Sequence, residues 1–163
     1  MMDGEIIGGE SMIPFYEELY NRFHELHQEI EQALEALPPE VLDWKPGPEM
    51  NSICVLITHL TGAERFLIGD VIMGEPSNRN RETEFQVAGL AKQDLLDRLT
   101  TVDSYIKGAF EKMFLADLEK SRTHPRNGKQ VSVSWAILHA LEHSATHLGH
   151  IQLTVQLLQL PEG

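Results

Sequence analysis

The sequence predicts an all-α protein built as one bundle of four helices. In four segments, apolar residues recur every three or four positions, which is the spacing of one face of an α-helix. Proline, glycine and polar turn residues separate these segments, and none of them shows the alternation of β-branched residues that is typical of a strand. With 163 residues the chain is the size of one ordinary domain. We therefore expect a single domain over residues 13–160, preceded by a flexible leader over residues 1–12.

The first two helices are expected on either side of a proline-rich connection. Residues 13–37 carry an apolar face, and this helix should end at Pro38, because proline cannot continue a helix. The second helix is expected over residues 53–73. Either Asn51 or Ser52 can cap its start, since both side chains accept a hydrogen bond from a free backbone N–H of the first turn.

Long polar connections flank the third helix. Residues 75–89 show no convincing period, and we expect them at the mouth of a pocket or at a dimer edge, since long loops in compact domains are often functional. A third helix is expected over residues 91–115. The fourth should begin after Ser132 or Ser134 and end at about residue 159. Connections of this length allow a crossover or a simple up-and-down order, so the pattern leaves the helix order open.

The composition excludes two classes of partner. Thirteen basic residues against 25 acidic ones give a net charge of −12, which repels nucleic acid and anionic membrane surfaces. No apolar run approaches the ~20 residues needed to span a bilayer. The single cysteine, Cys54, excludes an intramolecular disulfide, and residues 1–12 lack the basic start and apolar core of a secretory signal. We expect a cytoplasmic protein that binds neither nucleic acid nor membranes.

A row of four histidines on the predicted fourth helix is the most informative feature. Spacings of four, four and three residues place their rings within about 80° of one another: His139, His143, His147 and His150. From the centre of the apolar face, His147 lies about 40° away and His143 about 80°, whereas the other two lie at about 100° and 120°. The inward pair is therefore separated by four residues, a spacing with which metal-binding helices present two ring nitrogens to one ion.

A third ligand is expected from the second helix. His59 lies halfway along it, on the flank of its apolar face and at a matching depth. A buried imidazole without a partner costs roughly 1–3 kcal/mol, so inward-facing histidines need one. We interpret His59, His143 and His147 as the ligands of one metal ion. The alternative, a solvated stripe of histidines that bond to one another, stays open at this point.

Three further residues have less direct links to this site. His27 lies about 50° from the centre of the first helix's apolar face and could reach the same interior as a fourth ligand or an outer contact. Glu64 lies about 140° around the helix from His59, which predicts a surface position or an outer contact to the site. Cys54 has no histidine within one helical turn to activate it, so we expect a small buried filler.

Three segments resemble the DinB/YfiT-like family of metal-binding four-helix bundles. They are LDWKP at residues 42–46, HLTGAERF at residues 59–66 and LHALEHSATHLGHI at residues 138–151. The last segment looks like the family's His-x-x-x-His followed by a glycine and a polar residue, and the resemblance extends over nearly the whole chain. The chain departs from the pattern at Thr146, where the family commonly has another histidine, and at His150, where it commonly has glutamine.

The resemblance implies both a metal and an architecture. Family members bind zinc or nickel through one histidine of the second helix and the pair on the fourth, which carries over onto His59, His143 and His147. It also implies an up-down-down-up order of the helices and a homodimer.

Three functions are compatible with such a site. Three imidazole ligands leave a divalent ion its full charge and at least one open position. Characterised relatives of the family make activation of a low-molecular-weight thiol for transfer to an electrophile our first hypothesis, and metal-dependent hydrolysis the second. In both, His150 is the candidate general acid or base. The third is a non-catalytic stress or binding protein, whose ion should be closed by a fourth protein ligand such as His27 or Glu64.

Overall fold

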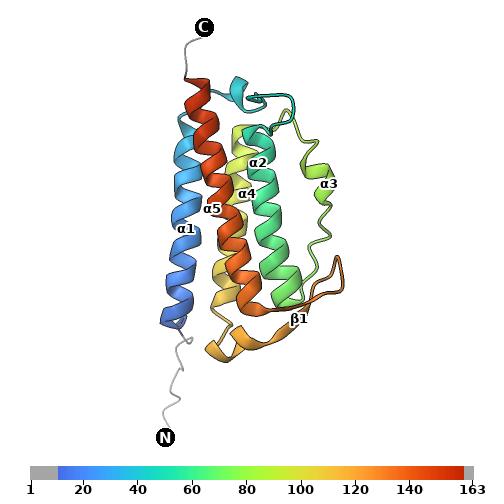
Figure 1. The fold of residues 1–163 in the computed structure, drawn as a ribbon. Helices are drawn as coiled ribbons and strands as arrows, with labels where there is room; N and C mark the ends of the chain where they lie inside the picture. The colour runs from blue at the N-terminus through green and yellow to red at the C-terminus, as the bar shows by residue number, and fades with distance from the viewer. Residues whose placement is uncertain (1–10, 160–163) are drawn as a thin grey trace, which may run out of the picture.

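Four long helices lie side by side in the computed structural model, which describes residues 11–159 (Figure 1). They are α1 (Pro14–Glu35), α2 (Ile53–Glu64) with its continuation η2 (Arg65–Met73), α4 (Lys92–Phe110) and α5 (Val133–Leu158). Each lies within the range predicted for it, so the four-helix fold class is confirmed. Nearly all of the predicted leader lies outside the described residues. No helix within residues 11–159 is apolar over enough of its length to cross a bilayer.

The helices follow an up-down-down-up order. In Figure 1, α1 and α5 run upward, whereas α2 and α4 run downward. Helix α1 packs against α4 and α5, and α2 packs against the same two helices. The first two long helices, α1 and α2, therefore lie diagonally opposite each other in the bundle. So do the last two, α4 and α5. The long connections permit this crossover, and the order implied by the family resemblance is the one observed.

Serine caps set the starts of α2 and α5. The Ser52 hydroxyl accepts a hydrogen bond from the backbone N–H of Val55 at 3.2 Å. The Ser132 hydroxyl accepts one from the N–H of Trp135 at 3.0 Å. Each satisfies a donor that the first turn of a helix leaves without a partner. Of the candidate caps predicted from the sequence, Ser52 rather than Asn51 caps α2, and Ser132 rather than Ser134 caps α5.

Helix α2 continues into η2, which is a nine-residue π-helix. Such wide turns are rare and occur frequently at functional sites. Gly74 ends the segment with a φ of +68°, in the left-handed region that glycine enters without a steric penalty. The apolar pattern of residues 65–73 fits an α-helix equally well, which is why the sequence does not reveal the wider turn.

The connection after η2 crosses the outer side of α2, and we call its residues 75–90 the strap (Figure 1). It contains the short helix α3 (Arg81–Glu84), whose start is capped by the Asn80 side chain. The segment is therefore more ordered than the featureless loop that its composition predicts.

Small elements fill the remaining connections. The single turn η1 (Pro39–Val41) joins α1 to α2, and η3 (Leu115–Glu119) follows α4. Strands β1 (Ser121–Thr123) and β2 (Gln130–Ser132) then pair antiparallel, with Arg122 opposite Val131. Three residues are too few to show a strand period, so the sequence signals only the turn between them.

A layer of polar side chains divides the interior into two apolar clusters. One cluster surrounds the first half of α1 and the other its second half. Between them, each long helix contributes one polar residue, and we call these four the polar layer: His27, Glu64, Asp103 and Ser144. Their hydrogen bonds connect all four helices, and His27, Glu64 and Ser144 are buried.

Candidate metal centre

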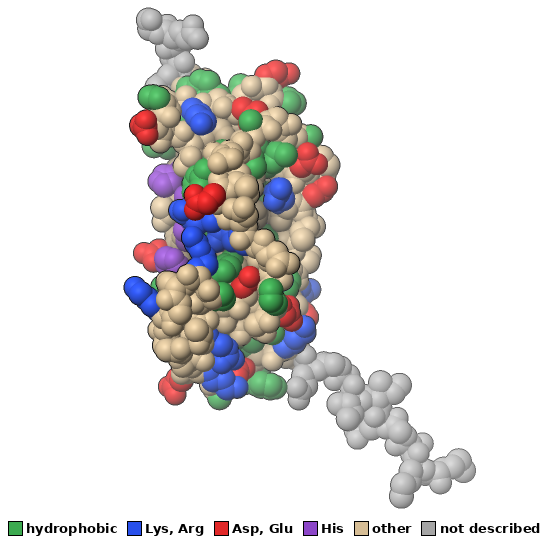
Figure 2. All heavy atoms as spheres, turned by 90° about the vertical axis from the view of Figure 1, so that its right-hand side faces the viewer, with side chains coloured by type: hydrophobic (Ala, Val, Ile, Leu, Met, Phe, Trp, Pro, Cys, Tyr) green, Lys and Arg blue, Asp and Glu red, His purple; other side chains and the backbone are tan. Residues whose placement is uncertain are grey.

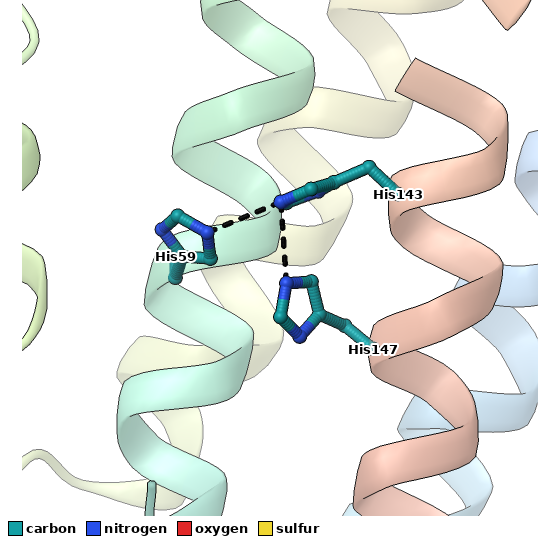
Figure 3. Close-up of side chains that lie close together, drawn as sticks. All are labelled: His59, His143 and His147. Carbon is teal, nitrogen blue, oxygen red and sulfur yellow. Dashed lines mark hydrogen bonds between the residues drawn. The ribbon is translucent and has the colours of Figure 1, made fainter. Parts of the chain in front are cut away.

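Three histidines meet between α2 and α5, where their rings point toward one another (Figure 3). Nε2 of His143 lies 3.1 Å from Nε2 of His59 and 3.2 Å from Nε2 of His147. One ring nitrogen of each residue lies within 4.8 Å of the other two. The structure thus brings together the three residues selected from the sequence, and their binding of a metal stays a prediction.

Two of the three separations between these nitrogens are close to those of a tetrahedral zinc site. Zinc–nitrogen bonds of about 2.0–2.1 Å in a tetrahedral site place neighbouring ligand atoms about 3.3 Å apart. The separations of 3.1 and 3.2 Å fall slightly below this value, a difference that small side-chain rotations would remove. Imidazole suits zinc, nickel, copper and iron, whereas magnesium and calcium prefer oxygen ligands. The ligand set therefore fits the predicted zinc or nickel.

The surroundings keep both α5 ligands uncharged. Burial, followed by the nearby rings of His147 and His59, lowers the pKa of His143 to about 3. Burial and the ring of His59 lower the pKa of His147 to about 4. Because a metal binds the neutral imidazole, both residues are in the form that binds at pH 7.

The strap supplies the neighbours of His59. Its Nδ1 donates a hydrogen bond to Oε2 of Glu84 at 2.8 Å, which leaves Nε2 facing the α5 pair. Arg79 holds the same carboxylate through hydrogen bonds of 2.6 and 2.8 Å. Phe85 packs on the His59 ring, with the ring centroids 4.7 Å apart. No sequence pattern singles out these contacts, although Asn80 followed by acidic residues is typical of a helix start and could have placed α3.

The two outer histidines lie beside the group and not in it. His139 is exposed and stacks on Trp135, with the ring centroids 4.8 Å apart. His150 is exposed, and its Nδ1 lies 3.4 Å from Nδ1 of His147, the ring nitrogen that does not face His143. His150 therefore contacts a proposed ligand on its outer side, and its role as a general acid or base stays a prediction.

His27 and Glu64 contact each other within the polar layer. Nε2 of His27 lies 2.9 Å from the Glu64 carboxylate, and Nδ1 lies 3.0 Å from Asp103. Ser144 also donates to Glu64. The prediction of a surface position for Glu64 is wrong: the turn of about 140° that directs it away from His59 directs it toward α1 instead of solvent. Neither residue lies among the ring nitrogens as a fourth ligand.

Cys54 lies in the apolar interior of the bundle. Its side chain is fully buried in the cluster that surrounds the second half of α1. Burial raises the pKa of the Cys54 thiol, which keeps it protonated and unreactive at neutral pH. The prediction of a small buried filler is confirmed.

A cavity of about 820 Å³ lies between α2, α4 and the strap. Glu84 and Arg79 line it, together with Ser77 and Val87, whereas the three histidines do not. The strap therefore lies beside a pocket, one of the two positions expected for it, and its place at a dimer edge stays a prediction. Figure 2 looks onto this side of the molecule and shows Lys and Arg side chains near the middle of the face, beside histidines at its edge.

A comparison with models of known protein families identifies the family of this chain. The DinB superfamily profile matches residues 22–151, which is most of the chain. The chain belongs to the DinB superfamily. This agrees with the helix order and with the position of the three histidines. The comparison with curated proteins gives no significant match.

Solved structures of other DinB-like proteins share the fold. YfiT from Bacillus subtilis, described as a probable metal-dependent hydrolase with an unusual four-helix bundle topology, aligns with a TM-score of 0.72 at 15% identity, over 97% of this chain and 96% of YfiT. A DinB-like protein from Bacillus cereus gives 0.71 at 15% identity, over 90% and 95%. YjoA from Bacillus subtilis gives 0.67 at 17% identity, over 89% and 94%. At these identities the likeness establishes the fold alone.

Proposed function

We propose that this DinB-superfamily protein is a divalent-metal-dependent enzyme that activates a small thiol for transfer to an electrophile. The observation that supports it is the meeting of three imidazoles without a fourth protein ligand among residues 11–159. Structural zinc sites are closed by four protein ligands, whereas catalytic sites keep a position for water or substrate. His27 and Glu64, which would close the site in a non-catalytic protein, bond to each other elsewhere.

The roles of the ligands follow from their charge and exposure. His59, His143 and His147 would hold zinc or nickel, and as uncharged ligands His143 and His147 would not offset its charge. When bound, such an ion supplies the Lewis acidity that keeps a thiol deprotonated. His143 and His147 are half-buried, so their exposed edges give a substrate its approach. Glu84 bonds to His59 and, together with Arg79, lines the cavity beside the strap.

The carboxylates near the site favour a thiol over water. No carboxylate oxygen within residues 11–159 joins the group of ring nitrogens. Glu84 is engaged by His59 and Arg79, and Glu64 lies in the polar layer. Many zinc hydrolases use a nearby glutamate as the base that activates water. A thiol that coordinates a metal loses its proton without such a base.

Metal-dependent hydrolysis is the second candidate. The description of YfiT as a probable metal-dependent hydrolase favours it, because that protein shares the fold over nearly its whole length. Three-histidine zinc sites can also lower the pKa of water to about 7 with no carboxylate ligand.

An assay with two substrates tests the proposal. Protein freed of metal and then reloaded with zinc or nickel is given 1-chloro-2,4-dinitrobenzene with cysteine or glutathione, or 4-nitrophenyl acetate without a thiol. We expect metal-dependent consumption of the thiol, lost in His147→Ala and kept in His139→Ala. Metal-dependent cleavage of the ester alone would favour the hydrolase. Metal binding without either reaction would contradict both enzymatic functions for these substrates.

A further inference from the structure

We propose that Glu84 is a positioning residue through which the strap sets the metal affinity of the three-histidine centre. Its carboxylate holds the ring of His59 in the orientation and tautomer that present Nε2 to the ion. The inference rests on the metal centre proposed above. It concerns metal binding itself, whichever reaction the centre catalyses.

The hydrogen bond from His59 to Glu84 selects one form of the ring. A neutral imidazole carries one N–H, and at 2.8 Å from the carboxylate that N–H belongs on Nδ1. Nε2 then carries the free lone pair, 3.1 Å from Nε2 of His143. By contrast, Nδ1 of His143 is buried and has no hydrogen-bond partner among residues 11–159. Among residues 11–159, the hydrogen bond to Glu84 is therefore the one carboxylate contact that fixes the tautomer of a proposed metal ligand.

Glu84 is itself held rigidly. Arg79 bonds both carboxylate oxygens, and the side chains of His59, Arg79 and Glu84 are only 8 to 9% exposed. Hydrogen bonds shielded from water are stronger than exposed ones, and the fixed fork of the guanidinium leaves the carboxylate little freedom. The direction of the Glu84 side chain thus determines the direction of the His59 ring.

Gly62 makes room for this arrangement. A Cβ atom at position 62 would lie 2.4 Å from Oε1 of Glu84 and 3.3 Å from Nε of Arg79. The first distance is far below van der Waals contact, so any larger residue would push the carboxylate away from α2. Gly62 itself touches none of the histidine nitrogens that would bind the metal, so its effect on binding should pass through Glu84.

The contact between Glu84 and His59 lies at the edge of the cavity. Glu84 and Arg79 line this cavity of about 820 Å³, whereas the strap side chains that pack against the apolar core, Val87 and Leu90, lie after α3 and do not depend on Glu84. Phe85, which packs on the His59 ring, and Arg79, whose Nη2 lies 3.4 Å from Nδ1 of His59, are the other strap side chains that contact the ring. Loss of Glu84 should therefore free the ring without unfolding the bundle.

Zinc affinity tests the proposal directly. Purified metal-free protein is titrated with zinc against a chromophoric chelator, and circular dichroism confirms the fold of each variant. We expect Glu84→Ala to bind zinc about 10- to 100-fold more weakly, the usual effect of removing a carboxylate behind a ligating histidine. Glu82→Ala, an exposed position on the same short helix, should bind like the wild type.

A double-mutant cycle tests the route of the effect. Gly62→Ala should weaken zinc binding in the wild type and have no further effect in Glu84→Ala, because the contact through which it acts is already missing. Gly108→Ala is the matched control, since a Cβ there meets nothing within 4 Å. Additive losses would show that Gly62 acts elsewhere and would overturn this route.

The Nδ1–H resonance of His59 provides a signature that a merely structural role would not change. In zinc-loaded wild type, nitrogen-15 spectra should show a His59 ring N–H protected from exchange, and Glu84→Ala should lose that protection. If Glu84→Ala lowers the melting temperature but leaves zinc affinity and this resonance unchanged, Glu84 only ties down the strap and the inference fails. If the wild type itself binds no zinc, both the proposed metal centre and the role of Glu84 are contradicted.

Discussion

His27 is the residue on which the polar layer depends. Burial alone would lower its pKa, but the facing carboxylates of Glu64 and Asp103 raise the pKa of His27 to about 10. The positive charge of the His27 ring therefore offsets the negative charge of the fully buried Glu64. We expect His27→Ala to lower the free energy of unfolding by about 3–5 kcal/mol in urea denaturation, because it leaves the buried Glu64 carboxylate without an opposite charge. His24→Ala, at an exposed ring, should cost under about 1 kcal/mol; equal losses would contradict this account.

Asp103 makes the stability of the layer depend on pH. Burial would raise its pKa, but hydrogen bonds from His27, His24 and Tyr20 lower the pKa of Asp103 from 3.8 to about 2. A carboxyl group with a lowered pKa in the folded state stabilises the protein above its unfolded pKa and loses this effect as the pH falls through the folded value. The stability gap between the wild type and Asp103→Asn should therefore shrink from pH 3.8 toward 2. Urea denaturation across this range measures it, and a constant or growing gap would disprove the assignment.

Individual residues differ in how far the sequence predicts them. The inward pair His143 and His147 follows from angles on one helix, because α5 is regular through this region. Glu64 shows the limit of that reasoning. An angle gives the direction relative to the same helix, but whether that direction meets solvent or α1 depends on where the neighbouring helices lie.

Helix α2, which carries His59, depends on one serine at its start. Ser52 is buried and accepts the N–H of Val55. Ser52→Ala should cost about 1 kcal/mol of unfolding free energy, the usual value for a lost N-cap. Asn51→Ala removes the other candidate cap and should stay within about 0.5 kcal/mol, as surface substitutions usually do. Chemical denaturation of both variants checks this, and the reverse order of losses would mean that Asn51 is the cap.

The elements that are not predicted from the sequence lack a distinctive residue period. The long helices are predictable because their period is repeated over many turns. Helix α3 and strands β1 and β2 are too short to repeat a period, and η2 changes the helical pitch within an apolar segment that suits either form. Glu84 lies in one of these short elements, so its contact with His59 becomes visible only in three dimensions.

The whole bundle brings the site together through its helix order. Because α2 and α5 are neighbours in the up-down-down-up arrangement, one histidine of α2 can meet two of α5. Connection lengths alone do not decide this order, whereas the family resemblance does. The homodimer that the resemblance also implies stays a prediction. Light scattering should give twice the 18.4 kDa mass of one chain, and the mass of a single chain would contradict it.

Metal content tests the central claim most directly. The purified protein is loaded with zinc, dialysed and analysed for metal beside the double variant His143→Ala/His147→Ala. We predict about one ion per wild-type chain and none in the variant, because a single remaining imidazole does not hold a transition metal against dialysis. A wild type that retains no metal, or a double variant that retains as much as the wild type, would contradict the three-histidine centre.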